Sequence, residues 1–472
     1  MVKFSKRMNL MFDMKSTFRK MRDFYYMEKM KTKLFYVWRS ISSNFWFIPV
    51  LMVLLAVGLS IIMQEIDKRV WIQSYPFFDL LYAGDPEGAR SVLTTVASSM
   101  ITVAGVVFSL TMVVLTLASS QFGPRLLRNF MSDRGNQIVL GTFVATFIYC
   151  LLILQTIKTT GEEKFTPSIS VSFAIVLAMV NIGVFIYFIH HISTSIQADR
   201  IVAKVFGELE KDLQRLFPEG RKCMVDEKKQ RELLQIFENV KNESGLTTIA
   251  PKSGYLRTIA EDSLLEIAKQ NELILHVQYH PGEFIVAGGS LVLAYGAKDF
   301  EEETSGQIIA CFRLGSQRTP DQDPEFAIHQ LVEVALRALS PGINDPFTAI
   351  TCIDYLGAAL CYLIHKDFPT QFHCDDEGKL RLIMQPTNFT GMLNAAFDQI
   401  RQYGQTSVAV TIHLLEALKT IAAQARSLEQ YQSILRQAEM IKRMSETALY
   451  EKLDKKDVKN RYLDLLEVLG EL

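Results

Sequence analysis

Five side chains in the C-terminal third of the sequence are of the types that acid–base or phosphate chemistry uses. They are His329, Glu333, Arg337, Asp345 and Asp354. The first three are spaced four residues apart, which places them on one face of a helix. A histidine beside carboxylates and an arginine could transfer a proton or hold a phosphate. The same residues could instead cap helices and form salt bridges around a buried turn, so both interpretations are open at this point.

Motifs that would settle the question in favour of catalysis are absent from the sequence. There is no G-x-x-x-x-G-K-[ST], G-x-G-x-x-G, H-E-x-x-H or G-x-S-x-G, so the usual nucleotide-driven and hydrolase machinery is not indicated. His365, His373 and Cys374 are metal-ligand types, but their spacing matches no familiar zinc pattern. We therefore expect no enzymatic activity, no catalytic residue, no cofactor and no metal site.

A second pattern lies in residues 92–118, a stretch of 27 residues without a formal charge. That length is enough for a helix to cross a bilayer. Small and hydroxyl residues recur there at intervals of three and four, which gathers them on one helix face. Such a face suits close packing against another helix, or a water-filled path shared by several copies. Its members are Thr95, Ser98, Thr102, Gly105, Ser109, Thr116 and Ser119.

The elements that must position these residues begin with four apolar stretches. We predict a transmembrane domain over residues 44–195 in which none of the spans contains Asp, Glu, Lys or Arg. Residues 64–91 are predicted to form a polar loop with more acids than bases. The lack of an ionisable residue at membrane depth argues against an ion-coupled carrier. The predicted spans are about 45–63, 92–118, 138–154 and 169–189.

The distribution of basic residues predicts the topology. Residues 1–43 hold 11 Lys and Arg against 3 acids and form a basic amphipathic segment suited to an anionic membrane surface. Arg125 and Arg128 follow the second span. The positive-inside rule then places both termini of a multi-pass membrane protein in the cytoplasm. Arg125 and Arg128 would lie at the cytoplasmic mouth of the second span.

The remainder of the sequence predicts an α+β cytoplasmic region. Residues 196–249 read as a helical connector, 250–318 as a small β-barrel or barrel-sandwich-like domain with its last strand at 308–312, and 319–472 as a helical bundle that is helical to its end. The expected fold class is thus an α-helical integral membrane protein with four spans and an α+β cytoplasmic region.

Two long motifs carry a resemblance to a known family. The runs A-G-V-V-F-S at 104–109 and L-A-S-S-Q-F-G-P-R-L-L at 117–127, with A-L-S-P-G-I-N-D-P-F-T-A at 338–349, resemble a widespread bacterial family of predicted membrane proteins called domain of unknown function 2254. The similarity covers nearly the whole chain after residue 43. It implies an inner-membrane protein and implies no activity, so no catalytic residue is transferred.

These observations support three hypotheses. The first is a homo-oligomeric channel or transport-like protein in which the second span lines the axis and the cytoplasmic part regulates it. The second is a non-conducting scaffold or sensor that binds a cytoplasmic partner. The third is a membrane-bound enzyme acting near His329 and Asp345. The expected partners are the lipid bilayer, further copies of the chain, and a cytoplasmic protein or small ligand; the formal net charge of −1 indicates no nucleic acid.

Overall fold

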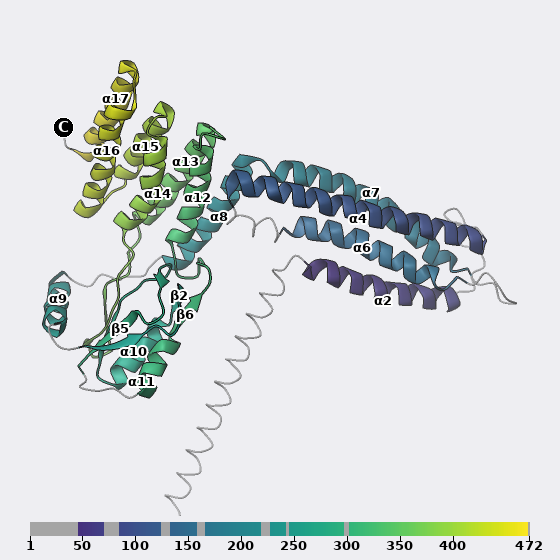
Figure 1. The fold of residues 1–472 in the computed structure, drawn as a ribbon, viewed down its shortest axis with the longest axis horizontal. Coiled ribbons are helices and arrows are strands. Elements are labelled where there is room, and N and C mark those ends of the chain that lie inside the picture. The colour runs from purple at the N-terminus through teal and green to yellow at the C-terminus, as the bar shows by residue number, and fades with distance from the viewer. Residues whose placement is uncertain are drawn as a thin grey trace, which may run out of the picture. The chain divides into compact units, whose positions relative to one another are not determined.

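The computed structural model describes residues 46–69, 85–123, 133–157, 166–218, 227–241, 245–296 and 302–470. The chain divides into two compact units, which Figure 1 shows as ribbons. We call residues 1–120 and 124–196 the membrane unit, and residues 121–123 and 197–472 the mixed unit. The expected basic segment at 1–43 and the mouth residues Arg125 and Arg128 lie outside the described residues.

Each predicted span forms a helix in the membrane unit. These helices are α2 (Phe47–Arg69), α4 (Pro86–Phe122), α6 (Arg134–Leu154) and α7 (Ser168–Ser195). The expectation of a loop over residues 64–91 is wrong at both ends, because α2 runs on to Arg69 and α4 already starts at Pro86. Charged residues such as Lys68 and Arg69 do not end a helix, since cations in the last turn interact favourably with its dipole.

The helices α2 and α6 approach each other closely at Gly141. A β-carbon at that position would lie 2.6 Å from Met52 Sδ and 3.1 Å from Pro49 Cα. Small residues at such contacts allow close van der Waals packing, which associates helices where lipid removes the hydrophobic driving force between them. The helices α6 and α7 also pack together, with Phe143 and Phe188 fully buried between them.

Asp67 on the last turns of α2 caps the first turn of α7. Its carboxylate accepts hydrogen bonds from the backbone N–H groups of Ile169 at 3.0 Å and Ser170 at 3.1 Å, and from the Ser170 hydroxyl. Only 8% of Asp67 is exposed. Tyr149 of α6 donates to the Ser170 carbonyl at 3.1 Å. First-turn N–H groups have no acceptor within their helix, so the Asp67 carboxylate joins α2 to α7, and the Tyr149 hydroxyl adds α6 at the same place.

The amide of Asn181 lies in the interior of the membrane unit. Asn181 of α7 donates to Thr146 Oγ1 of α6 at 2.8 Å and to the Leu177 carbonyl at 2.8 Å. Asn181 is 1% exposed. A buried polar group is costly unless it is hydrogen-bonded, so the pair fixes how α6 and α7 face each other.

The described residues contain five helices long and apolar enough to cross a membrane, and four of them are those of the membrane unit. The fifth is α13 (Pro346–Leu363) of the mixed unit. It packs against α8 (Ala198–Leu216), α12 (Glu325–Ala338) and α15 (Val408–Ala422). The chain is thus a mostly helical protein with several apolar helices, and the count of four spans stays a prediction.

The helices of the mixed unit follow their sequence signals. In α8 the buried residues Val202, Val205 and Leu209 form one side. The helix packs against α12 and α13. Asp345 caps α13 as expected, because its carboxylate accepts from the Thr348 N–H at 3.1 Å. The remaining helices are α9 (Glu227–Lys241), α10 (Glu261–Gln270), α11 (Glu302–Ala310), α14 (Phe389–Gly404), α16 (Leu428–Ala448) and α17 (Lys452–Leu469).

The mixed unit also holds two small β-sheets. One has the order β1-β5-β3-β8-β7 and the other the order β4-β2-β6. All neighbours are antiparallel except β3 and β8, which are parallel. Leu264 and Ile308 of α10 and α11 share a buried core with Leu275 of β3. The strands are β1 (Leu246–Ile249), β2 (Gly254–Ile259), β3 (Ile274–Val277), β4 (Phe284–Ile285), β5 (Ser290–Tyr295), β6 (Phe312–Gly315), β7 (Phe372–Cys374) and β8 (Leu380–Ile383).

Two sequence expectations about this region are wrong. Residues 319–472 are not helical throughout, because β7 and β8 lie there and join the sheet through β3. The strand expected at 308–312 is instead the end of helix α11, and β6 begins only at Phe312. The sheets form a small mixed α/β region, and the barrel-like interpretation stays a prediction.

Two buried ion pairs stabilise loops of this region. Arg318 contacts the Asp323 carboxylate through Nε at 2.8 Å and through an Nη at 2.7 Å, and the Asp323 side chain is 2% exposed. Arg381 Nε donates to Asp375 at 2.8 Å.

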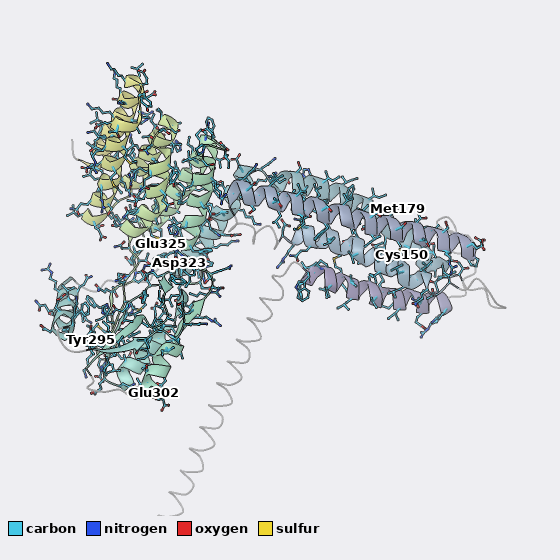
Figure 2. The ribbon with its side chains drawn as sticks, in the orientation of Figure 1. Cys150, Met179, Tyr295, Glu302, Asp323 and Glu325 are labelled. Carbon is cyan, nitrogen blue, oxygen red and sulfur yellow. The ribbon has the colours of Figure 1, made fainter. Side chains whose placement is uncertain are left out.

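Figure 2 marks Asp323 together with Glu325, which follows it two residues later. Burial raises the pKa of Glu325, and the neighbouring Asp323 charge adds to that rise.

Candidate functional site

The small and hydroxyl residues predicted to form one face of the second span do share a face of α4. We call Thr95, Ser98, Thr102, Gly105, Ser109, Thr116 and Ser119 the hydroxyl face. The opposite face contributes Leu93, Ala97 and Ala104 to cores shared with α6 and α7. At about 100° per residue the centre of the hydroxyl face lies roughly 130° around the helix from the centre of Leu93, Ala97 and Ala104. The hydroxyl face therefore points away from the chain's own helices.

Burial agrees with this geometry. Six members of the hydroxyl face are exposed in the single chain, and Ser119 is partly buried. A β-carbon added at Gly105 would meet no atom within 4 Å. The face is thus smooth and uncovered, whereas Gly141 in α6 is covered by another helix. The helices that the structure describes leave the exposed members of this face uncovered within the single chain.

The hydroxyl groups have partners within their own helix. Thr95 donates to the Ser91 carbonyl at 2.8 Å, Thr102 to the Ser98 carbonyl at 2.7 Å and Thr116 to the Met112 carbonyl at 2.9 Å. This back-bonding to the preceding turn satisfies the donor. It leaves the hydroxyl oxygen as an acceptor, so the face can contact either protein or water without a large desolvation cost.

The residues that end α4 group with the mixed unit. Gly123 has φ +107°, and a β-carbon there would lie 2.5 Å from Glu333 Oε1 and 3.1 Å from Arg337 Nε. Glu333 and Arg337, both on α12, approach each other at 3.7 Å. Glycine adopts this positive φ angle readily because it has no β-carbon, and a β-carbon would not fit so close to Glu333 and Arg337. The two sequence motifs, about 200 residues apart by the numbering of Gly123 and Glu333, therefore meet here.

The structure shows separate contacts for several members of the proposed polar cluster, and the cluster as one site stays a prediction. Asp345 is occupied as the cap of α13. Asp354 accepts from His413 Nε2 of α15 at 2.6 Å, and the Asp354 side chain is 61% exposed. Glu333 and Arg337 lie beside Gly123, and His329 lies two turns before Arg337 on the same helix. The capping interpretation thus holds for Asp345, and the sequence did not reveal that His413 is the partner of Asp354.

One further polar contact at the end of the membrane unit was missed by sequence reasoning. Asp133 caps α6 by accepting from the Gly135 N–H at 2.7 Å. Its carboxylate also lies 3.2 Å from His191 Nε2 of α7, and the His191 ring stacks on Tyr187 at 5.5 Å. An aspartate just before an apolar run is a usual capping signal, but its histidine partner could not be read from spacing.

The long apolar helices and their shared cores define a multi-pass membrane protein with an added α/β region. Residues 42–420 match the family described as predicted membrane protein, domain of unknown function 2254. The chain belongs to this family, as the sequence resemblance indicated.

Curated relatives extend this result across most of the chain. It is 34% identical over 390 residues to the uncharacterised protein Rv1290c of Mycobacterium tuberculosis, covering 80% of this chain and 71% of the relative. The uncharacterised protein Mb1321c of Mycobacterium bovis matches with the same identity and coverage. No solved structure matches the chain.

Proposed function

We propose that the chain assembles into a homo-oligomeric channel of the bacterial inner membrane, in which the hydroxyl faces of several α4 helices surround a common axis. The observation that carries the proposal is the exposure of Ser98, Thr102 and Gly105 on the side of α4 opposite its buried face. Contact with lipid alone does not require seven small or hydroxyl residues on one helix face, whereas contact with another helix or with water explains them.

The dimensions and chemistry of α4 suit this role. Its 37 residues give a length of about 55 Å, which exceeds the roughly 30 Å hydrocarbon core. Hydroxyl oxygens along the axis offer acceptors to passing ions or water, and no formal charge lies between residues 92 and 118 to trap an ion. Arg125 and Arg128 at the cytoplasmic mouth would favour anions. Both termini and the mixed unit lie in the cytoplasm in this arrangement, and four helices span.

Ion flux through liposomes containing the purified full-length protein tests the proposal. Gly105→Leu and Ser109→Leu place bulk on the axis, so we expect flux to fall at least about 10-fold. Gly183→Leu is the matched control, because Gly183 on α7 is also exposed with no atom within 4 Å of an added β-carbon. A tenfold effect corresponds to about 1.4 kcal/mol in the barrier. Equal flux in Gly105→Leu and Gly183→Leu, or no flux from folded wild-type oligomer, overturns the channel.

A non-conducting scaffold is the second candidate, and one observation favours it. The hydroxyls of Thr95, Thr102 and Thr116 already donate to carbonyls of α4, so contact with water is not required to satisfy them. In a scaffold the hydroxyl face would only pack helix against helix. The scaffold predicts that Gly105→Leu lowers the oligomeric mass in detergent while the wild-type oligomer conducts nothing.

A further inference from the structure

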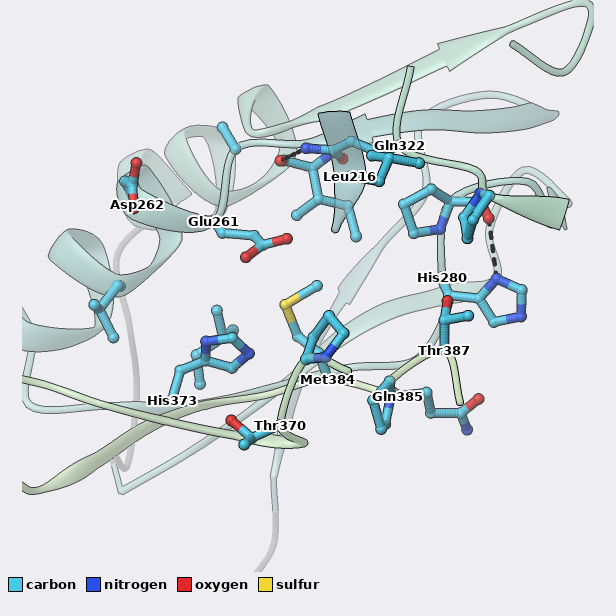
Figure 3. Close-up of a pocket in the computed structure, with 18 of the residues that line it drawn as sticks. Leu216, Glu261, Asp262, His280, Gln322, Thr370, His373, Met384, Gln385 and Thr387 are labelled. Atoms are coloured by element: carbon cyan, nitrogen blue, oxygen red, sulfur yellow. Dashed lines mark hydrogen bonds between the residues drawn. The ribbon is translucent and has the colours of Figure 1, made fainter. Parts of the chain in front are cut away.

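The mixed unit contains a cavity of about 590 Å³ that none of the preceding arguments uses. It is lined by the end of α8, the first turn of α10, the loop at 280–281 and the segments around β7 and β8. Its volume falls within the range of about 300–1,000 Å³ found for small-molecule sites. Figure 3 shows that the side chains of Glu261, His373 and Met384 face the same space from different elements.

Glu261 is the side chain in this cavity that a ligand would contact through hydrogen bonds. Its carboxylate is partly buried, and in the part of the chain that the structure describes no hydrogen bond or ion pair to it is found. The charged neighbour Arg215 is turned elsewhere, since it donates to Asp212 at 2.8 Å and to the Pro320 carbonyl at 2.6 Å. An ionised carboxylate in a cavity is an acceptor with two oxygens that only N–H or O–H donors can satisfy.

The rest of the wall is rigid and largely apolar. Gln322 is held in place, because it donates to the Ile259 carbonyl at 3.1 Å and accepts from the Ile259 N–H at 2.8 Å. Polar side chains of Arg215, Asp262, Ser263, His280, Thr370, His373, Gln385 and Thr387 also line the cavity. The apolar contributions are surfaces that can pack against a planar ring. They come from Leu216, Pro281, Pro369, Leu382, Met384 and Pro386.

These features exclude two of the simpler ligand classes. An anion would meet the carboxylate of Glu261, and Asp262 in the same turn of α10 adds a second negative charge nearby. A compact ammonium ion would pair with Glu261 and leave the apolar wall unfilled, which gives little affinity in a site of this size. A planar ring that carries N–H donors on one edge satisfies both the carboxylate and the wall.

We propose that this cavity binds a guanine nucleoside, with the guanine N1–H and exocyclic N2–H donating to the two oxygens of Glu261. Two parallel N–H donors match a carboxylate in the bidentate manner that arginine uses. Adenine presents an acceptor, N1, beside its amino group, so it offers the carboxylate one donor and one repulsive contact. The ribose then lies toward the polar side chains of Thr370 and Thr387. The site is confined to the mixed unit and does not depend on conduction.

Isothermal titration of the full-length protein in detergent with guanosine and with adenosine tests the proposal. We expect guanosine to bind at least about 10-fold more tightly than adenosine, because a site built around buried polar groups discriminates strongly when one is left unpaired. Glu261→Gln keeps the shape but replaces one acceptor oxygen by a donor, and it should weaken guanosine binding at least about 10-fold. Glu266→Gln is the matched control, because Glu266 lies on the same helix, is exposed and does not line the cavity, and it should change the affinity less than about twofold.

A second variant separates the contribution of the apolar wall to binding from that of the Glu261 carboxylate. Met384→Ala removes apolar surface without touching the carboxylate, so it should weaken guanosine and adenosine by similar factors. Far-UV circular dichroism of each variant reports its fold. The proposal is overturned if neither nucleoside binds folded wild type, if adenosine binds as tightly as guanosine, if Glu261→Gln binds guanosine like wild type, or if spermidine binds in place of both nucleosides.

Discussion

The two units of the chain treat their polar groups in opposite ways. In the mixed unit the charged residues that lie inside, Asp323 and Asp375, are paired with Arg318 and Arg381 within the same chain. In the membrane unit the largest set of polar side chains, the hydroxyl face of α4, is exposed. The buried charges Asp323 and Asp375 of the mixed unit thus have partners within the chain, whereas the membrane unit leaves one helix face for something outside the chain.

Within the membrane unit itself the same contrast recurs between helix ends and helix faces. Contacts of charged side chains that join helices lie near helix ends, at Asp67 with Ser170 and at Asp133 with His191, whereas the uncharged Asn181–Thr146 contact lies farther along α6 and α7. Close packing along the helices depends on Gly141, while Gly105 and Gly183 face open space. Substitutions at these positions distinguish contacts that fold the unit from a face that serves assembly.

Asp67→Ala should have the largest effect on folding. It leaves the N–H groups of Ile169 and Ser170 and the Ser170 hydroxyl without their acceptor, which for a buried charged cap costs about 2–4 kcal/mol. The three tryptophans, Trp38, Trp46 and Trp71, all precede the second span, so tryptophan fluorescence during heating in detergent reports on this unit. We expect a lower unfolding temperature.

Glu65→Ala is the control for Asp67→Ala. Glu65 lies two residues earlier on α2, and its side chain is 51% exposed and pairs with Lys68 at 3.1 Å. Exposed pairs contribute about 0–1 kcal/mol. If both variants unfold at the same temperature, Asp67 does not join α2 to α7 in the way described.

Gly141→Ala should destabilise the membrane unit by about 1–2 kcal/mol. The added methyl group meets Met52 and Pro49, and overpacking of a tight contact forces α2 and α6 apart. Gly105→Ala and Gly183→Ala add the same group where there is open space, so neither should lower the unfolding temperature of the monomer. Size-exclusion mass measurements on Gly105→Ala then report assembly alone. A destabilised Gly105→Ala monomer would place the hydroxyl face inside the chain's own fold.

Asp375→Asn tests the mixed unit through its pH dependence. The hydrogen bond from Arg381 holds the pKa of Asp375 below its usual value of 3.8. A lowered pKa in the folded state means that the ionised carboxylate stabilises the fold above about pH 4, and that this contribution is lost as the pH falls through the lowered value. We expect faster hydrogen exchange in β7 and β8 of the variant at pH 7, and convergence with wild type near pH 2. A constant difference at both pH values would contradict the pairing.

Long apolar helices were predictable from the sequence, and contacts between distant residues were not. Residues 92–118 are apolar enough that the helix and its hydroxyl face follow from periodicity. Asp67 was assigned to a loop, because the apolar run ends at about residue 63, whereas the helix continues to Arg69. Its role depends on Ser170, about 100 residues away, and spacing along the sequence carries no information about such a pair.

The structure of short segments was predicted wrongly for a different reason. Residues 308–312 are apolar and β-branched, and periodicity alone does not separate a strand of that length from a buried helix end. The strands β7 and β8 have three and four residues, and they exist because β8 pairs with β3 in parallel. Tertiary contact overrides local preference in such cases. The Glu261 cavity was missed for the same reason, since its walls come from segments about 170 residues apart, at Arg215 and Thr387.

Glu325→Gln should have the smallest effect and the opposite sign. Burial, followed by the charge of Asp323, raises the pKa of Glu325 above its usual value of 4.5, so the ionised form is disfavoured in the folded state. The folded state is then favoured below pH 4.5, and this stability declines as the pH rises through the raised value. At pH 7 the neutral amide should stabilise the mixed unit by on the order of 0.5 kcal/mol, seen as slower hydrogen exchange in α12. Glu302→Gln, on the exposed first turn of α11 and marked with Glu325 in Figure 2, is the control and should change nothing. Destabilisation by Glu325→Gln at pH 7 would mean that this carboxylate, like Asp323, has its charge satisfied inside the unit.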